Sequence, residues 1–120
     1  MVVHVARVYD SPPPDGGARV LVDRLWPRGV RKDAGIWDLW MPEVAPSTAL
    51  RLWFGHDPSR YQGFRERYLA ELQAPSGVLA LQRLGALGEG GRLVLLTATA
   101  DLRHSAAAVL REVLGGPSPP

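Results

Sequence analysis

The segment that most restricts the fold is an apolar run near the end of the chain, RLVLLTA at residues 92–98, in which polar and apolar residues do not alternate. A shorter run of the same kind, RVLVD, occupies residues 19–23. Because such runs are typical of strands covered on both faces, both predict inner strands of an α/β sheet. A further strand is predicted at the N-terminus, with one face formed by Val3, Val5 and Arg7 and the other by His4, Ala6 and Val8. The loop at residues 11–18 holds no crossover helix, so antiparallel pairing of the first two strands is an alternative.

Helical patterns fill the rest of the chain. Ser47 stands at an N-cap position before an apolar pattern, and Asp57-Pro58 starts a helix that runs to Leu72. Residues 76–87, with Ser76 as the cap, and residues 103–114 predict two more helices. The fold class is therefore α/β: a single compact domain over residues 1–115, with a small, mostly parallel sheet flanked by helices in a three-layer, Rossmann-like arrangement. Residues 116–120 predict a disordered tail.

Composition excludes several classes of protein. The chain has no cysteine, which rules out disulfides, thiolate metal sites and a cysteine nucleophile. No apolar run is long enough to cross a bilayer and no signal peptide is recognisable, so we expect a cytoplasmic protein without a membrane partner. Three scattered histidines lack metal-ligand spacing, and neither glycine-rich phosphate motif nor a nucleophile elbow is present. We expect no metal and no cofactor.

The first candidate site is DRLWPRG at residues 23–29, directly after a predicted strand. Ligands gather beyond the carboxyl ends of strands in open α/β sheets. Arg24 and Arg28 beside Trp26 suit an anionic or aromatic ligand, and Asp23 would orient an arginine or take a proton. The alternative is a structural latch, in which Asp23 pairs with Arg24 or Arg28 and Trp26 fills the core.

The second candidate site follows the last predicted strand, where the chain reads TATADLRH. Thr97 and Thr99 are candidate ligand-binding residues, and Asp101 and His104 are candidate acid-base residues near a helix N-terminus. Asp101 has a structural alternative as the cap of that helix. Arg51, with His56, is placed to reach a neighbouring cleft.

Five segments together resemble one family over residues 2–115: RVYD at 7–10, RVLVDRLWPRG at 19–29, PSTALRLWFGHDP at 46–58, FRERYLAEL at 64–72, and LLTATAD with His104. They are similar to the YeaO-like proteins, the short branch of the domain of unknown function 488 (DUF488). The resemblance implies a compact α/β fold and no established reaction. Longer relatives carry a cysteine, a glutamate and a cysteine-histidine-arginine group, and the matching positions here are Thr97, Thr99 and Ser105 with Ala106 and Ala107. The resemblance therefore implies that any thiol or metal chemistry of those relatives lacks its atoms in this chain.

Three functions fit these observations. The first is a pocket for a small anionic ligand or nucleotide at the strand ends, which leaves open whether the protein is an enzyme. The second is a nucleic-acid-binding module that uses the basic segment Arg19–Lys32, with Trp26 and Trp37 as stacking platforms; the net charge of only +2 disfavours it. The third is a structural or interaction protein without catalysis. The sequence does not predict the oligomeric state.

Overall fold

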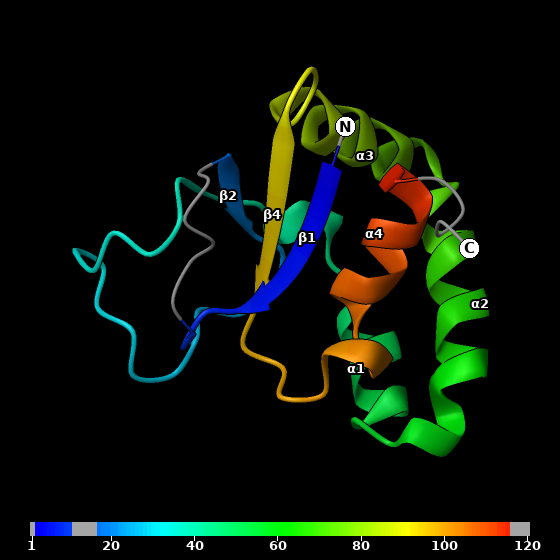
Figure 1. Ribbon diagram of the computed structural model, residues 1–120. Helices are drawn as coiled ribbons and strands as arrows, with labels where there is room; N and C mark the ends of the chain where they lie inside the picture. Colours follow the sequence, from blue (N-terminus) through cyan, green and yellow to red (C-terminus); the bar gives the residue numbers. More distant parts are fainter. Residues whose placement is uncertain (1, 11–16, 116–120) are drawn as a thin grey trace.

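A computed structural model describes residues 2–10 and 17–115 of the chain (Figure 1). The strands are β1 (Val2–Arg7), β2 (Ala18–Leu21), β3 (Leu39–Trp40) and β4 (Arg92–Thr97). The helices are α1 (Thr48–Phe54), α2 (Tyr61–Leu72), α3 (Pro75–Leu87) and α4 (Ala106–Gly115), with short 3₁₀ turns at Pro42–Val44, Pro58–Arg60 and Leu102–His104. The disordered tail predicted at 116–120 and most of the predicted loop at 11–18 lie outside the described residues.

The strands form one four-stranded sheet in the order β1-β4-β2-β3, and all three pairings are parallel. β4 lies in the interior, where Val5 is in register with Leu95 on one side and Val20 with the same Leu95 on the other. Antiparallel pairing of the first two strands is therefore wrong, because β4 separates them. The parallel arrangement brings the carboxyl ends of β1, β2 and β4 to one end of the sheet, and this end carries the site.

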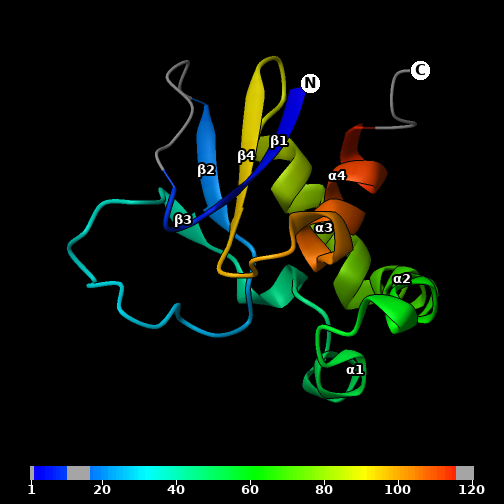
Figure 2. The same cartoon turned by 60° about the horizontal axis from the view of Figure 1, so that its bottom comes forward.

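The sheet separates two apolar clusters, as the alternation along β1 predicts. Val3 and Val5 face the larger cluster, which all four helices join, while Ala6 and Val8 face a smaller one. Figures 1 and 2 show the helices gathered on one side of the sheet and the chain between β2 and β3 on the other. That chain covers the second face with Val30, Ile36 and Trp37. The prediction of a compact α/β domain with a small parallel sheet is confirmed, and its third layer is irregular.

The predicted cap is right for α1 and wrong for α3, and α4 starts later than predicted. The hydroxyl of Ser47 accepts a hydrogen bond from the amide of Leu50 (3.2 Å), which confirms Ser47 as the cap of α1. α3 begins at Pro75 without a side-chain cap, so the predicted role of Ser76 is wrong. α4 begins at Ala106 rather than residue 103, because residues 102–104 turn too tightly to join it. Within the described part of the chain, no helix is both long and apolar enough to cross a membrane.

Candidate functional site

A cavity of about 490 Å³ lies beyond the carboxyl ends of β2 and β4. Most of its wall comes from three stretches of chain: residues 22–28 after β2, residues 45–56 in and around α1, and residues 98–106 from the end of β4 to the start of α4. Tyr9 and Phe64 complete the wall. These stretches bring together most of the predicted site residues. Asp23, Arg24, Trp26, Arg28, Arg51, Thr99 and His104 line the cavity, together with His56. Thr97 and Asp101 do not line the cavity, but Thr97 is hydrogen-bonded to Asp23 and Asp101 to His104.

Asp23 ties the end of β2 to the end of β4. Its carboxylate accepts hydrogen bonds from the Thr97 hydroxyl (2.7 Å) and the Ala98 amide (2.8 Å), and its backbone carbonyl accepts one from the indole of Trp40 (2.7 Å). Burial raises the pKa of this carboxyl, although the two hydrogen bonds to it act in the opposite direction. Neither neighbouring arginine contacts it, so the alternative in which Asp23 pairs with Arg24 or Arg28 is wrong.

Arg24 joins the first stretch of the cavity wall to the second. Its Nε donates to the carbonyl oxygen of Pro46 (2.9 Å) and its Nη2 to that of Ala45 (3.2 Å). Both acceptors are neutral, so the positive charge of the half-buried guanidinium is not neutralised by these contacts. A guanidinium has five N–H groups, and those not used here are free to bind a ligand in the cavity.

Arg51 and Arg28 supply two more guanidinium groups. The Nε of Arg51 is buried and has no hydrogen-bond partner among residues 2–10 and 17–115. Arg28 is exposed; its backbone carbonyl accepts a hydrogen bond from the Tyr9 hydroxyl (2.9 Å), while its side chain makes no ion pair with any described residue. Buried polar groups normally have partners, and an unsatisfied one calls for an explanation. Arg51 also makes no ion pair with a described residue, so it brings an uncompensated positive charge to the cavity wall.

Trp26 belongs to a cluster of tryptophans that shapes the loop. Its indole N–H donates to the carbonyl of Val30 (2.7 Å), and its ring lies edge-on to Trp37 (4.8 Å between centroids) and to Trp40 (5.5 Å). These contacts hold residues 26–40 against the sheet, where edge-to-face aromatic pairs are favourable. The indole is therefore half-buried in the loop and also forms part of the cavity wall.

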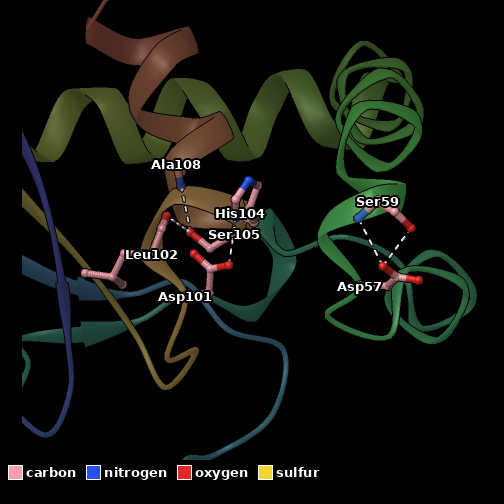
Figure 3. A network of polar contacts seen from close by, with 7 residues as sticks. All are labelled: Asp57, Ser59, Asp101, Leu102, His104, Ser105 and Ala108. Atoms are coloured by element: carbon pink, nitrogen blue, oxygen red, sulfur yellow. Dashed lines mark hydrogen bonds and ion pairs between the residues drawn. The ribbon is translucent and has the colours of Figure 1, made fainter.

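His104 and Asp101 form a hydrogen-bonded pair at the rim (Figure 3), with Nδ1 and Oδ2 2.7 Å apart. This bond lowers the pKa of Asp101, so the carboxylate is ionised and Nδ1 carries the proton. The ring of His104 also lies edge-on to Tyr61 on α2 (5.1 Å). The two contacts fix the orientation of the His104 ring at the rim of the cavity.

Ser105, not Asp101, caps α4. Its hydroxyl accepts a hydrogen bond from the amide of Ala108 (3.1 Å) and donates to the carbonyl of Leu102 (2.7 Å), as Figure 3 shows beside the pair at His104. The predicted cap at Asp101 is thus wrong, because the Asp101 carboxylate is hydrogen-bonded to the His104 ring instead of to the backbone amides at the start of α4. The same figure shows Asp57 accepting bonds from Ser59, which confirms Asp57 as the start signal for the turn before α2.

The basic segment of the nucleic-acid hypothesis is partly neutralised. Arg19 bonds to Asp38 through its backbone amide (2.8 Å) and its guanidinium (3.1 Å), and Arg31 lies 3.3 Å from Asp33. Arg24 turns into the cavity instead of extending along a basic edge. Within the described ranges, no three histidine or acidic side chains are grouped so as to hold a metal ion.

Sequence reasoning missed the apolar part of the cavity wall. Phe54 and Phe64 line it, with rings stacked at 4.3 Å and 18°, and so does Leu25, which is 57% exposed. Phe54 and Phe64 belong to the two helices that the sequence predicts after Ser47 and after Asp57-Pro58, but the helical patterns did not show that these side chains reach the strand ends. Leu25 was not predicted to be a site residue, because attention fell on the charged residues that surround it in the sequence.

Comparison with known proteins gives a family but no reaction. The model of a family described as "Inactive DUF488-N3 subclade" matches residues 2–117. The chain is 45% identical over 116 residues to the uncharacterized proteins Rv3073c of Mycobacterium tuberculosis (strain H37Rv) and Mb3100c of Mycobacterium bovis, covering 95% of this chain and 94% of each relative. It is 49% identical over 72 residues to the uncharacterized protein YeaO of Escherichia coli (strain K12), covering 60% of this chain and 63% of YeaO. No solved structure matches the chain.

Proposed function

The chain belongs to the DUF488 family, in a subclade described as inactive, and from this premise we propose that it binds a small anionic ligand without catalysing a reaction. The ligand would sit in the cavity at the strand ends. The absence of catalysis is supported by Thr97 and Thr99, which match the positions where longer relatives carry a cysteine and a glutamate. Thr97 is buried here with its hydroxyl on Asp23, and Thr99 has no carboxylate, so these positions offer the cavity neither a thiol nucleophile nor an acidic proton carrier.

The proposal rests above all on the three guanidinium groups of Arg24, Arg28 and Arg51 around one cavity. Arg24 and Arg28 come from the stretch after β2 and Arg51 comes from α1, and no carboxylate in the described residues pairs with any of them. The acid beside them, Asp23, already accepts two hydrogen bonds from the end of β4. Guanidinium groups suit carboxylate and phosphate because their planar forks bind two oxygens at once.

The test is calorimetric titration with inorganic phosphate in a buffer of low ionic strength. We expect saturable binding by the parent protein and a loss of at least about tenfold in affinity in Arg28→Met, since each charge-assisted bond contributes roughly 1.5–3 kcal/mol. Arg111→Met is the matched control, because Arg111 is exposed on α4 and is not part of the cavity wall. Equal affinities in all three proteins, or no heat of binding in the parent, would contradict the proposal. Tight binding of an oligonucleotide that weakens steeply with salt would favour the nucleic-acid alternative instead.

A further inference from the structure

The cavity is too large for a bare anion. Its volume of about 490 Å³ falls within the range of roughly 300–1,000 Å³ that small-molecule sites occupy. A water molecule takes up about 30 Å³ of the liquid, and an inorganic oxyanion replaces only a few waters. Most of the space would stay wet if phosphate were the whole ligand, so the ligand has a second part.

Part of the cavity wall is apolar. Phe54 and Phe64 are 5% and 2% exposed, and their stacked rings belong to the main core while also lining the cavity. Leu25 also lines the cavity and leaves 57% of its surface exposed. Apolar surface is stabilised by removal from water, at about 25 cal/mol per Å². The second part of the ligand is therefore an apolar group, and Leu25 is the residue among these three with substantial exposed surface for it to cover.

The charge of the site matches a dianion better than a monoanion. Arg24, Arg28 and Arg51 bring three positive charges, and Asp23 brings at most one negative charge. The surplus of two is what a phosphate monoester neutralises near neutral pH, because its second ionisation has a pKa of about 6. A single carboxylate would leave one guanidinium without an anionic partner. Arg51 lines the cavity from α1 and makes no ion pair with a described residue, so its guanidinium can serve as the anchor.

Building on the function proposed above, we infer that the cavity takes an organic phosphate monoester: a dianionic phosphate held by Arg51 and Arg28, joined to a flat apolar group that lies against Leu25 and the phenylalanines. Nucleoside monophosphates and aryl phosphates share this chemistry. The inference goes beyond anion binding because it requires both halves of the ligand on one molecule.

Four probes separate the halves: inorganic phosphate, methyl phosphate, phenyl phosphate and benzoate, titrated by calorimetry at pH 7.5. Burying a phenyl ring adds well over 1.4 kcal/mol of transfer free energy, so phenyl phosphate should bind at least about tenfold more tightly than methyl phosphate. Benzoate has the ring but one negative charge, and it should bind at least about tenfold more weakly than phenyl phosphate. Adenosine monophosphate set against adenosine then extends the comparison to nucleotides, with the same order expected.

Variants locate the two halves. Leu25→Ser should weaken phenyl phosphate about fivefold while leaving methyl phosphate unchanged, because only the apolar contact is lost. Leu52→Ser is its control, since Leu52 is 67% exposed on α1 and does not line the cavity. Arg51→Met should weaken both phosphates, and the exposed Arg28→Met provides the same test without altering a buried position.

The outcomes distinguish this inference from the broader proposal. Equal affinities for methyl and phenyl phosphate would overturn the amphipathic ligand while leaving anion binding in place. Benzoate binding as tightly as phenyl phosphate would overturn the dianion. If none of the anions binds, the proposed function itself is wrong. The inference is supported if phenyl phosphate binds more tightly than both methyl phosphate and benzoate, and if Leu25→Ser weakens the binding of phenyl phosphate.

Discussion

Replacing Arg51 by methionine should stabilise the empty protein and abolish its response to ligand. The buried Nε of Arg51 lacks a hydrogen-bond partner in the described structure, and an unsatisfied buried polar group costs about 1–3 kcal/mol. Methionine keeps the unbranched shape of the stem and has no polar hydrogen to satisfy. Because Arg51 is only half-buried, the gain lies at the low end, about 1 kcal/mol. For a domain of 120 residues this corresponds to a rise in Tm of about 3–5 °C.

The assay is thermal unfolding followed by far-ultraviolet circular dichroism in a phosphate-free buffer, with and without phenyl phosphate. Ligand at a hundred times its Kd should stabilise the parent by about 2.7 kcal/mol and the variant by much less. Arg111→Met, on the exposed face of α4, should stay within about 0.5 kcal/mol of the parent and keep the full ligand response. A variant that melts below the parent and still gains the full ligand shift would refute the reasoning, because Arg51 would then serve the fold and not the site.

Three further predictions concern the fold. Gly77→Ala should destabilise the protein by about 2–3 kcal/mol in urea unfolding, because a Cβ there would lie 2.5 Å from the carbonyl oxygen of Glu71; an unchanged midpoint would show that α3 can shift. Tyr68→Phe removes the 2.5 Å hydrogen bond to the Val44 carbonyl and should cost about 1–2 kcal/mol by the same method, whereas a neutral result would mean that water replaces the hydroxyl. Burial raises the pKa of Asp23 above its ordinary 3.8, so the neutral form is favoured in the fold and its contribution to stability is lost as pH rises through the folded pKa. Urea unfolding between pH 3 and 7 should therefore show the parent losing stability relative to Asp23→Asn as pH rises, and a difference that is constant or grows with pH would contradict this sign.

The sequence predicted the parts of the fold that local patterns encode. Apolar runs without alternation correctly indicated β2 and β4, and Ser47 and Asp57 marked helix starts because capping depends on nearby backbone amides. β3 was missed because it has only two residues and pairs only with β2. Its position depends on long-range contacts such as the bond from the Trp40 indole to the carbonyl of Asp23, which no local pattern reveals.

The candidate site was predictable in its residues but not in its contacts. Strand ends drew attention to Asp23 and Thr97, yet the bond between them spans 74 positions and depends on β2 and β4 being neighbours. From the sequence, a neighbouring arginine was a possible partner of Asp23. In the fold, the partners of Asp23 are the Thr97 hydroxyl and the Ala98 amide. Capping propensity alone does not show whether Asp101 or Ser105 caps α4, since both residue types are good caps. The start of α4 depends on the 3₁₀ turn at Leu102–His104, after which Ser105 is the capping residue.

The order of the strands also governs how the protein can be made. β4 is the shared neighbour of β1 and β2, and it is the last strand in the chain. During synthesis the first two strands leave the ribosome about seventy residues before the segment that joins them, and a sheet with such distant pairings assembles slowly. The nascent chain therefore has no complete sheet until residue 97 has emerged, and a product truncated before that point exposes two apolar strands with nothing between them.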